Sequence, residues 1–142
     1  MKIFEKSLKD YWHTSKEFFI AMIALGIVQV VIAELVGNLS DSTIMIISLV
    51  VSIIALTIVF LAGFFAVRNH KFNLKQATFV GILAFLVTIW LIPFSIPIDA
   101  AQLALGNLIF VYVINTAILA ALNIVIVAPV AAFGGWIAKK IK

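Results

Sequence analysis

Residues 43–67 read TIMIISLVVSIIALTIVFLAGFFAV and contain no charged residue and no proline. An α-helix rises about 1.5 Å per residue, so about 20 apolar residues suffice to cross a ~30 Å hydrocarbon layer. This segment is 25 residues long, which leaves room for tilt. It therefore predicts a membrane-spanning helix, and the apolar segments on either side of it are expected to be its partners in a bundle.

The composition of the whole chain indicates the same class of protein. Of the 142 residues, 65% are hydrophobic and only 11% are charged, and a soluble domain of this length needs a more charged surface. The net charge of +4 is typical of membrane proteins with lysine-rich cytoplasmic connections, so it does not indicate nucleic-acid binding. The chain has no cysteine, which excludes disulfides, thiolate metal ligands and thiol catalysis.

Three more apolar segments are long enough to cross the same layer. We predict an all-α fold, a polytopic membrane protein in which residues 18–142 form a four-transmembrane-helix bundle. Pro129 lies inside the last span and is expected to kink or interrupt it near that residue. The four predicted spans cover about residues 18–36, 43–67, 74–92 and 108–138.

The first 17 residues differ from the spans because they mix charged and apolar side chains. Phe4, Leu8, Tyr11 and Trp12 fall on one helical face, and the lysines occupy the other faces. Segments of this kind lie in the headgroup region of a bilayer. Residues 1–17 are therefore predicted to form an amphipathic interfacial helix that precedes the first span.

The connections between the spans are short and contain signals for helix ends. Asn73, followed three residues later by Gln76, predicts a capping box at the start of the third span. Pro93 and Pro97 should end that span, because proline lacks the amide donor that a helix needs. We expect a short interfacial helix over about 97–105 before the fourth span, and a re-entrant loop is the alternative.

The lysine and arginine residues are distributed very unevenly along the chain. Four lie in the N-terminal segment, three in the 68–75 connection and three at the C-terminus, which accounts for all ten. The 37–42 and 93–106 connections have none. Short basic connections stay in the cytoplasm. We therefore predict a protein of the cytoplasmic (inner) membrane with its N- and C-termini in the cytoplasm, in agreement with four spans.

Small or polar residues recur at spacings of three and four along each span. Lipid tails give no hydrophobic push between helices, so close approach of small residues holds such bundles together, and these stripes should face inward. They comprise Gly26, Gln29, Ala33 and Gly37, then Ser48, Ser52, Ala55, Val59, Ala62 and Ala66, then Ala77, Gly81, Ala84 and Thr88, and finally Thr116, Ala120, Asn123, Val127, Ala131 and Gly134.

Several polar residues fall near the middle of the membrane and form a candidate polar layer. Two interpretations remain open. The first is a set of hydrogen bonds between helices, worth about 0.6 kcal/mol each, and the second is a site for a polar substrate or ion. No member is ionisable, which favours the first, and Asn115 is expected to face a partner subunit. The members are Gln29, Ser52, Thr88, Asn115, Thr116 and Asn123.

Charged and imidazole side chains offer two further candidates. Glu34, Asp41 and Asp99 are the acidic residues of the outer side, and such a cluster can gather a cation at a pore mouth. Solvated helix ends and caps are the commoner role of these residues. His13 and His70 have no second ligand at metal-binding spacing in the sequence, so a solvated or interfacial role is expected.

No motif for catalysis is present in the sequence. It has no nucleophile with an adjacent base, no phosphate-binding glycine loop and no HExxH. We expect no enzyme activity and no cofactor or metal. Two function classes remain: a non-catalytic accessory, assembly or lipid-interacting membrane subunit, or a small oligomeric channel or transporter for an ion or small solute. The expected partners are membrane lipid and either further copies of the chain or other membrane subunits, and not nucleic acid.

Overall fold

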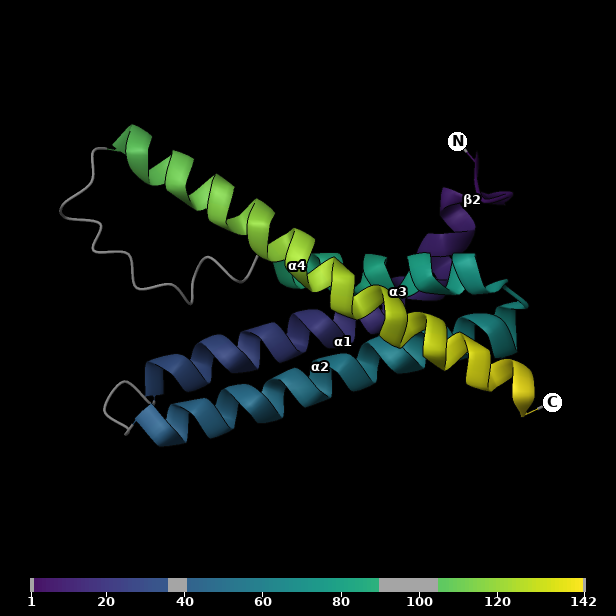
Figure 1. Cartoon of the computed structure of the whole chain (residues 1–142), viewed down its shortest axis with the longest axis horizontal. Coiled ribbons are helices and arrows are strands. Elements are labelled where there is room, and N and C mark those ends of the chain that lie inside the picture. Colours follow the sequence, from purple (N-terminus) through teal and green to yellow (C-terminus); the bar gives the residue numbers. More distant parts are fainter. Residues whose placement is uncertain (1, 36–40, 90–104, 142) are drawn as a thin grey trace.

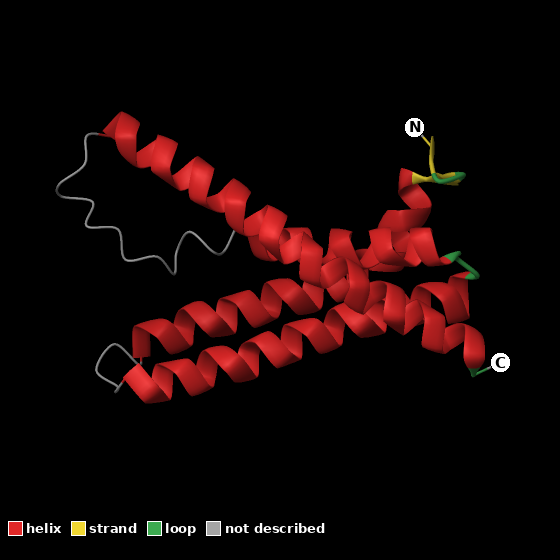
Figure 2. Ribbon diagram, viewed as in Figure 1, coloured by secondary structure: helices red, strands yellow, loops and turns green. Residues whose placement is uncertain are grey.

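The computed structural model describes residues 2–35, 41–89 and 105–141. Helices account for nearly all of them, and a two-stranded hairpin precedes the first helix (Figure 1, Figure 2). Three of the helices, α1, α2 and α4, are long and apolar enough to cross a membrane, and α3 is a shorter apolar helix. The elements are β1 (Lys2–Ile3), β2 (Lys6–Ser7), α1 (Leu8–Leu35), α2 (Asp41–His70), α3 (Leu74–Ile89) and α4 (Leu105–Lys140).

α2 and α4 contain the predicted spans 43–67 and 108–138 and extend beyond them. α1 and α3 cover the predicted spans 18–36 and 74–92 as far as Leu35 and Ile89, and the last residues of both predictions lie outside the described residues. α1 starts at Leu8, ten residues before the predicted start at 18, and α2 continues to His70. There Lys71 adopts a left-handed conformation with φ 54°, which is a common way to end a helix. Pro93, Pro97 and the expected helix over 97–105 lie outside the described residues, except for Leu105, which begins α4.

Pro129 does not interrupt its helix, and the kink expected near this residue stays a prediction. α4 is a single helix of 36 residues that contains Pro129 in its second half. Proline removes one backbone hydrogen bond and crowds the carbonyl four residues earlier. Both Pro129 and Val125, which carries that carbonyl, are exposed on the outward side of α4. The proline therefore disturbs no contact with another helix, and α4 continues to the C-terminal lysines.

Residues 2–7 form a hairpin and not the first turns of an amphipathic helix. β1 and β2 pair antiparallel, and Phe4 and Glu5 form the turn with φ of 47° and 72°. Left-handed conformations at both central residues are typical of a type I′ turn. The chain becomes helical only at Leu8, so the prediction of a helix over residues 1–17 is wrong for residues 2–7.

A capping box formed by Ser7 and Asp10 fixes the start of α1. The Asp10 carboxylate accepts hydrogen bonds from the Ser7 amide at 3.0 Å and from the Ser7 hydroxyl at 2.7 Å. The Asp10 amide donates to the Ser7 hydroxyl oxygen at 3.2 Å. This reciprocal pair satisfies helix-end donors that would otherwise lack acceptors.

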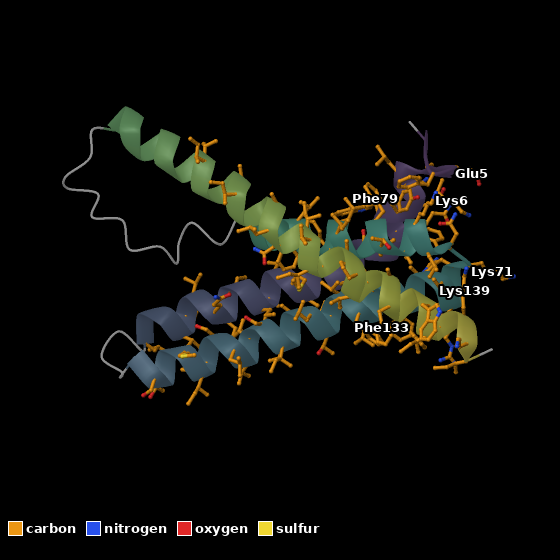
Figure 3. All side chains as sticks on the ribbon, viewed as in Figure 1. Glu5, Lys6, Lys71, Phe79, Phe133 and Lys139 are labelled. Atoms are coloured by element: carbon orange, nitrogen blue, oxygen red, sulfur yellow. The ribbon has the colours of Figure 1, made fainter. Side chains whose placement is uncertain are left out.

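The N-terminus, the α2–α3 connection and the C-terminus lie at the same end of the molecule (Figure 1). Lys6, Lys71 and Lys139 come from these three segments and lie at this end of the molecule, as does Glu5 (Figure 3). We call it the basic end. The opposite end, where α1 ends and α2 and α4 begin, is called the outer end.

The helices are most tightly packed where α2 crosses α4. A Cβ atom added at Gly63 would collide with the carbonyl group of Ala131, and one added at Gly134 would collide with the carbonyl oxygen of Phe60. Glycine at these two positions therefore lets the two backbones touch. Ala62, Ala66 and Ala131 are also fully buried, which confirms that the small-residue stripes of these spans face inward here.

Candidate functional site

An apolar cluster closes the bundle at the level where all four helices meet. It consists of Met22 from α1, Val59 from α2, Phe85 from α3, and Val127 and Ala131 from α4. Met22, Val59 and Ala131 have no exposed surface. We call these five residues the central cluster, and the predicted polar residues are placed relative to it.

Gln29 lies on the inward side of α1 but is exposed. It is seven residues, or about two turns and ~10 Å, beyond Met22 toward the outer end. Residues seven positions apart lie on nearly the same helix face. Met22 is fully buried, whereas Gln29 is exposed. The side of α1 that packs against its neighbours at the central cluster is therefore uncovered at Gln29.

Ser52 has the equivalent position on α2. It precedes Val59 by seven residues, so it is also two turns nearer to the outer end, and it is exposed. Its hydroxyl donates to the Ser48 carbonyl of the same helix at 2.8 Å. Asn123 precedes Val127 on α4 by four residues and is half-buried. These three side chains thus lie outward of the central cluster on the inward sides of three helices.

For most of the remaining predicted residues, the structure gives the helix on which each lies but not the position of its side chain. The side chains of Thr88 in α3 and of Asn115 and Thr116 in α4 lie outside the described part of the structure, as do those of Glu34 and Asp41, and Asp99 is outside the described residues altogether. Within the described part, no hydrogen bond joins Gln29 to Ser52. The proposed outer acidic cluster stays a prediction.

The first half of α4 departs from the other helices toward the outer end (Figure 1). Val113 lies fourteen residues before Val127, on nearly the same helix face. Val113 is 58% exposed and Val127 is 1% exposed. Beyond the central cluster, α1, α2 and α4 therefore each leave at least one inward residue exposed, namely Gln29, Ser52 and Val113. Gly26 on α1 and Val51 on α2 are still buried there.

The basic end contains a second set of contacts, part of which the sequence predicts. The predicted capping box is confirmed: the Gln76 amide donates to the Asn73 side-chain oxygen at 2.9 Å, and the Asn73 amide donates to the Gln76 side-chain oxygen at 2.8 Å. The Gln76 side-chain amide also donates to the Phe4 carbonyl at 2.6 Å. This last bond ties the hairpin to the start of α3 and was not predicted.

Aromatic side chains reinforce the same junction. Tyr11, which is fully buried, meets Phe72 and Phe79 edge to face at 5.5 and 4.9 Å between ring centroids. Phe4 meets Phe79 in the same manner at 6.3 Å. Sequence reasoning placed Phe4 and Tyr11 on one helical face toward lipid headgroups, whereas the structure directs both against α3.

His13 and His70 are neighbours in space although they are 57 positions apart. Their rings are 6.3 Å apart between centroids and nearly perpendicular. The sequence predicts two isolated histidines, because the spacing of metal-binding motifs identifies only ligands that are close together along the chain. Among the described residues, no group of three or more histidine, cysteine, aspartate or glutamate side chains is arranged to hold a metal ion.

Comparisons of the chain with protein-family models, with curated proteins and with solved structures find no match.

Proposed function

We propose that this chain crosses the cytoplasmic membrane four times with both termini on the cytoplasmic side. Three helices have the necessary length and apolar character, and the fourth crossing would be α3 with the residues that follow it, to about 92. The basic end combines ten basic residues with three acidic ones, Glu5, Asp10 and Glu17, whereas the outer half of the chain has three acidic residues and no basic one. Such a concentration of basic residues at one end supports a cytoplasmic position for the basic end.

Within the membrane we propose that the chain is a non-catalytic subunit whose outer half packs against helices of another membrane protein. The observation that carries this proposal is the exposure of Gln29 on a helix side that is fully buried two turns away. A polar amide in hydrocarbon is costly unless it is hydrogen-bonded. Polar side chains and small residues are also the groups that join membrane helices. A helix from a partner would supply both the hydrogen bond and the missing cover.

A small channel or transporter is the second candidate, and the same uncovered polar groups favour it. The central cluster argues against an open pathway within one copy of the chain, because its apolar side chains fill the space between the four helices. A pathway would therefore have to form between copies. This is why we prefer the subunit role.

Purification in a mild detergent tests the choice between the two candidates. The subunit role predicts that another membrane protein co-purifies in fixed proportion, and that Gln29→Leu lowers its recovery at least fivefold. The matched control is Val28→Leu, because Val28 is exposed on the outward side of the same helix. A stable homo-oligomer that conducts ions or solutes in liposomes would contradict the subunit role and support the second candidate.

A further inference from the structure

Four aromatic rings form a continuous strip over the crossing of α2 and α4. Phe60 and Phe64 lie on α2 and their rings stack at 6.4 Å, while Phe133 and Trp136 lie on α4 and stack at 5.8 Å. Phe60 and Phe133 join the two pairs at 6.1 Å. We call these four residues the aromatic strip. It follows a U-shaped path along α2, across to α4 and back toward the basic end.

The strip exists because the two helices touch at glycines. Gly63 and Gly134 bring the backbones together, so the rings on both sides of the contact can meet. Spacings of four on α2 and three on α4 keep each pair on one helix face. Phe133 is 54% exposed and Trp136 is 43% exposed, so the strip is a surface feature and not part of the core.

A basic side chain lies at each end of the aromatic strip. The Arg68 guanidinium lies 5.6 Å from the Phe64 ring centroid, and the Lys140 ammonium lies 4.4 Å from the Trp136 ring centroid. Both side chains are exposed, and neither is in an ion pair within the described part of the chain. The aromatic rings hold the two cations in place but do not neutralise them, so both can bind an anion.

We propose that the aromatic strip with Arg68 and Lys140 is a binding site for an anionic phospholipid. The two cations would bind the headgroup phosphate, for which the guanidinium fork is well suited. The acyl chains would lie on the exposed rings of Phe133 and Trp136 and continue toward the outer end. Basic positions between membrane helices on the cytoplasmic side are common sites for such headgroups. The inference rests on the membrane orientation proposed above.

Native mass spectrometry of the purified chain in neutral detergent tests the site. Phosphatidylglycerol should remain bound and phosphatidylcholine should not. The double variant Arg68→Gln/Lys140→Gln should weaken phosphatidylglycerol binding at least tenfold. The matched control is Lys6→Gln/Lys75→Gln, which removes the same charge at the same end. Lys6 also stacks on a ring, that of Phe72, but Phe72 is buried, so the control should weaken binding less than threefold.

Three results would overturn the proposal. Equal losses in the two double variants would show that only the overall positive charge attracts the lipid. Displacement of the lipid by millimolar inorganic phosphate would identify a site for free phosphate. Equal retention of phosphatidylcholine would show that the headgroup charge has no part in binding. Circular dichroism of each variant establishes that it is folded.

Tryptophan fluorescence gives an independent measurement of the same contact. With Trp12 and Trp90 replaced by phenylalanine, phosphatidylglycerol brominated on its acyl chains should quench Trp136, and Arg68→Gln/Lys140→Gln should reduce the quenching. Unchanged quenching in that variant would contradict the site. Resistance of the chain to carbonate extraction tests separately whether the chain is integral to the membrane. Loss of lipid binding in a chain that resists extraction would count against the lipid site alone, whereas a chain that is extracted would count against the proposed function as well.

Discussion

Toward the basic end the four helices and the hairpin are joined by buried apolar residues, edge-to-face rings and reciprocal capping bonds, whereas toward the outer end several residues on the same helix sides are exposed. Met22 and Gln29 on α1, and Val59 and Ser52 on α2, are pairs that differ by only two turns. The first member of each pair is fully buried and the second is exposed. The described helices therefore pack closely at one end and leave Gln29 and Ser52 exposed toward the other.

The largest expected effect comes from a variant that disrupts the close contact between α2 and α4. Gly63→Val places a branched side chain where even one Cβ collides with the Ala131 carbonyl, so α2 and α4 must separate. We expect a loss of about 3 kcal/mol or more in unfolding free energy, measured by unfolding in mixed micelles. Ala24→Val is the control, because Ala24 is exposed on the outward side of α1 and should change stability little.

A second pair of variants compares the two halves on one face of α1. Met22→Ala leaves a cavity in the central cluster and should cost about 2–5 kcal/mol. Gln29→Leu removes an exposed amide and should change the stability of the isolated chain by less than about 0.5 kcal/mol. Similar losses of unfolding free energy in the two variants would contradict the difference in packing between the two parts of α1.

A third variant tests the junction between the hairpin and α3. Gln76→Leu removes one of the two bonds of the capping box, the one that the Asn73 amide donates to the Gln76 side chain, and leaves the Phe4 carbonyl without its donor. We expect a loss of about 2 kcal/mol, together with faster amide hydrogen exchange at residues 2–7. The neighbouring exposed Lys75, replaced by alanine, serves as the control. Unchanged exchange in the hairpin would show that Gln76 does not hold it.

The smallest expected effect is a gain in stability, whereas the variants above lose stability. Glu5 has φ 72° in the hairpin turn, a conformation that glycine adopts without steric cost. Glu5→Gly should therefore stabilise the chain by about 0.5–1 kcal/mol, whereas Glu17→Gly, inside α1, should destabilise it by a similar amount. A loss of stability in both variants would mean that the turn is not strained.

The parts of the fold that sequence predicts best are those set by local signals. The uninterrupted apolar run at 43–67 and the pair Asn73 and Gln76 each correspond to an observed element, because length and capping depend on neighbouring residues. Ser7 and Asp10 carry a similar signal, SLKD beside NLKQ, which would have placed the start of α1 correctly.

The features that were missed depend on contacts far apart in sequence. The Gln76 bond to Phe4 joins residues 72 positions apart, and the amphipathic pattern of the first residues cannot distinguish a lipid surface from the flank of α3. The exposure of Gln29 also has no local signal, because its position on the inward stripe predicts burial. The exposure of Gln29 depends on the direction of α4 relative to α1, and helical periodicity does not specify that direction.

The central claim is that the basic end and the outer end lie on opposite sides of a membrane. The chain has no cysteine, so single cysteines can be introduced at Lys6, Lys71 and Lys139, and at Leu39 and Ala100 in the two connections that the sequence predicts on the opposite side. A membrane-impermeant thiol reagent applied to intact cells should label positions 39 and 100 only, and positions 6, 71 and 139 only after lysis. Labelling of position 6 or 139 in intact cells would contradict the account.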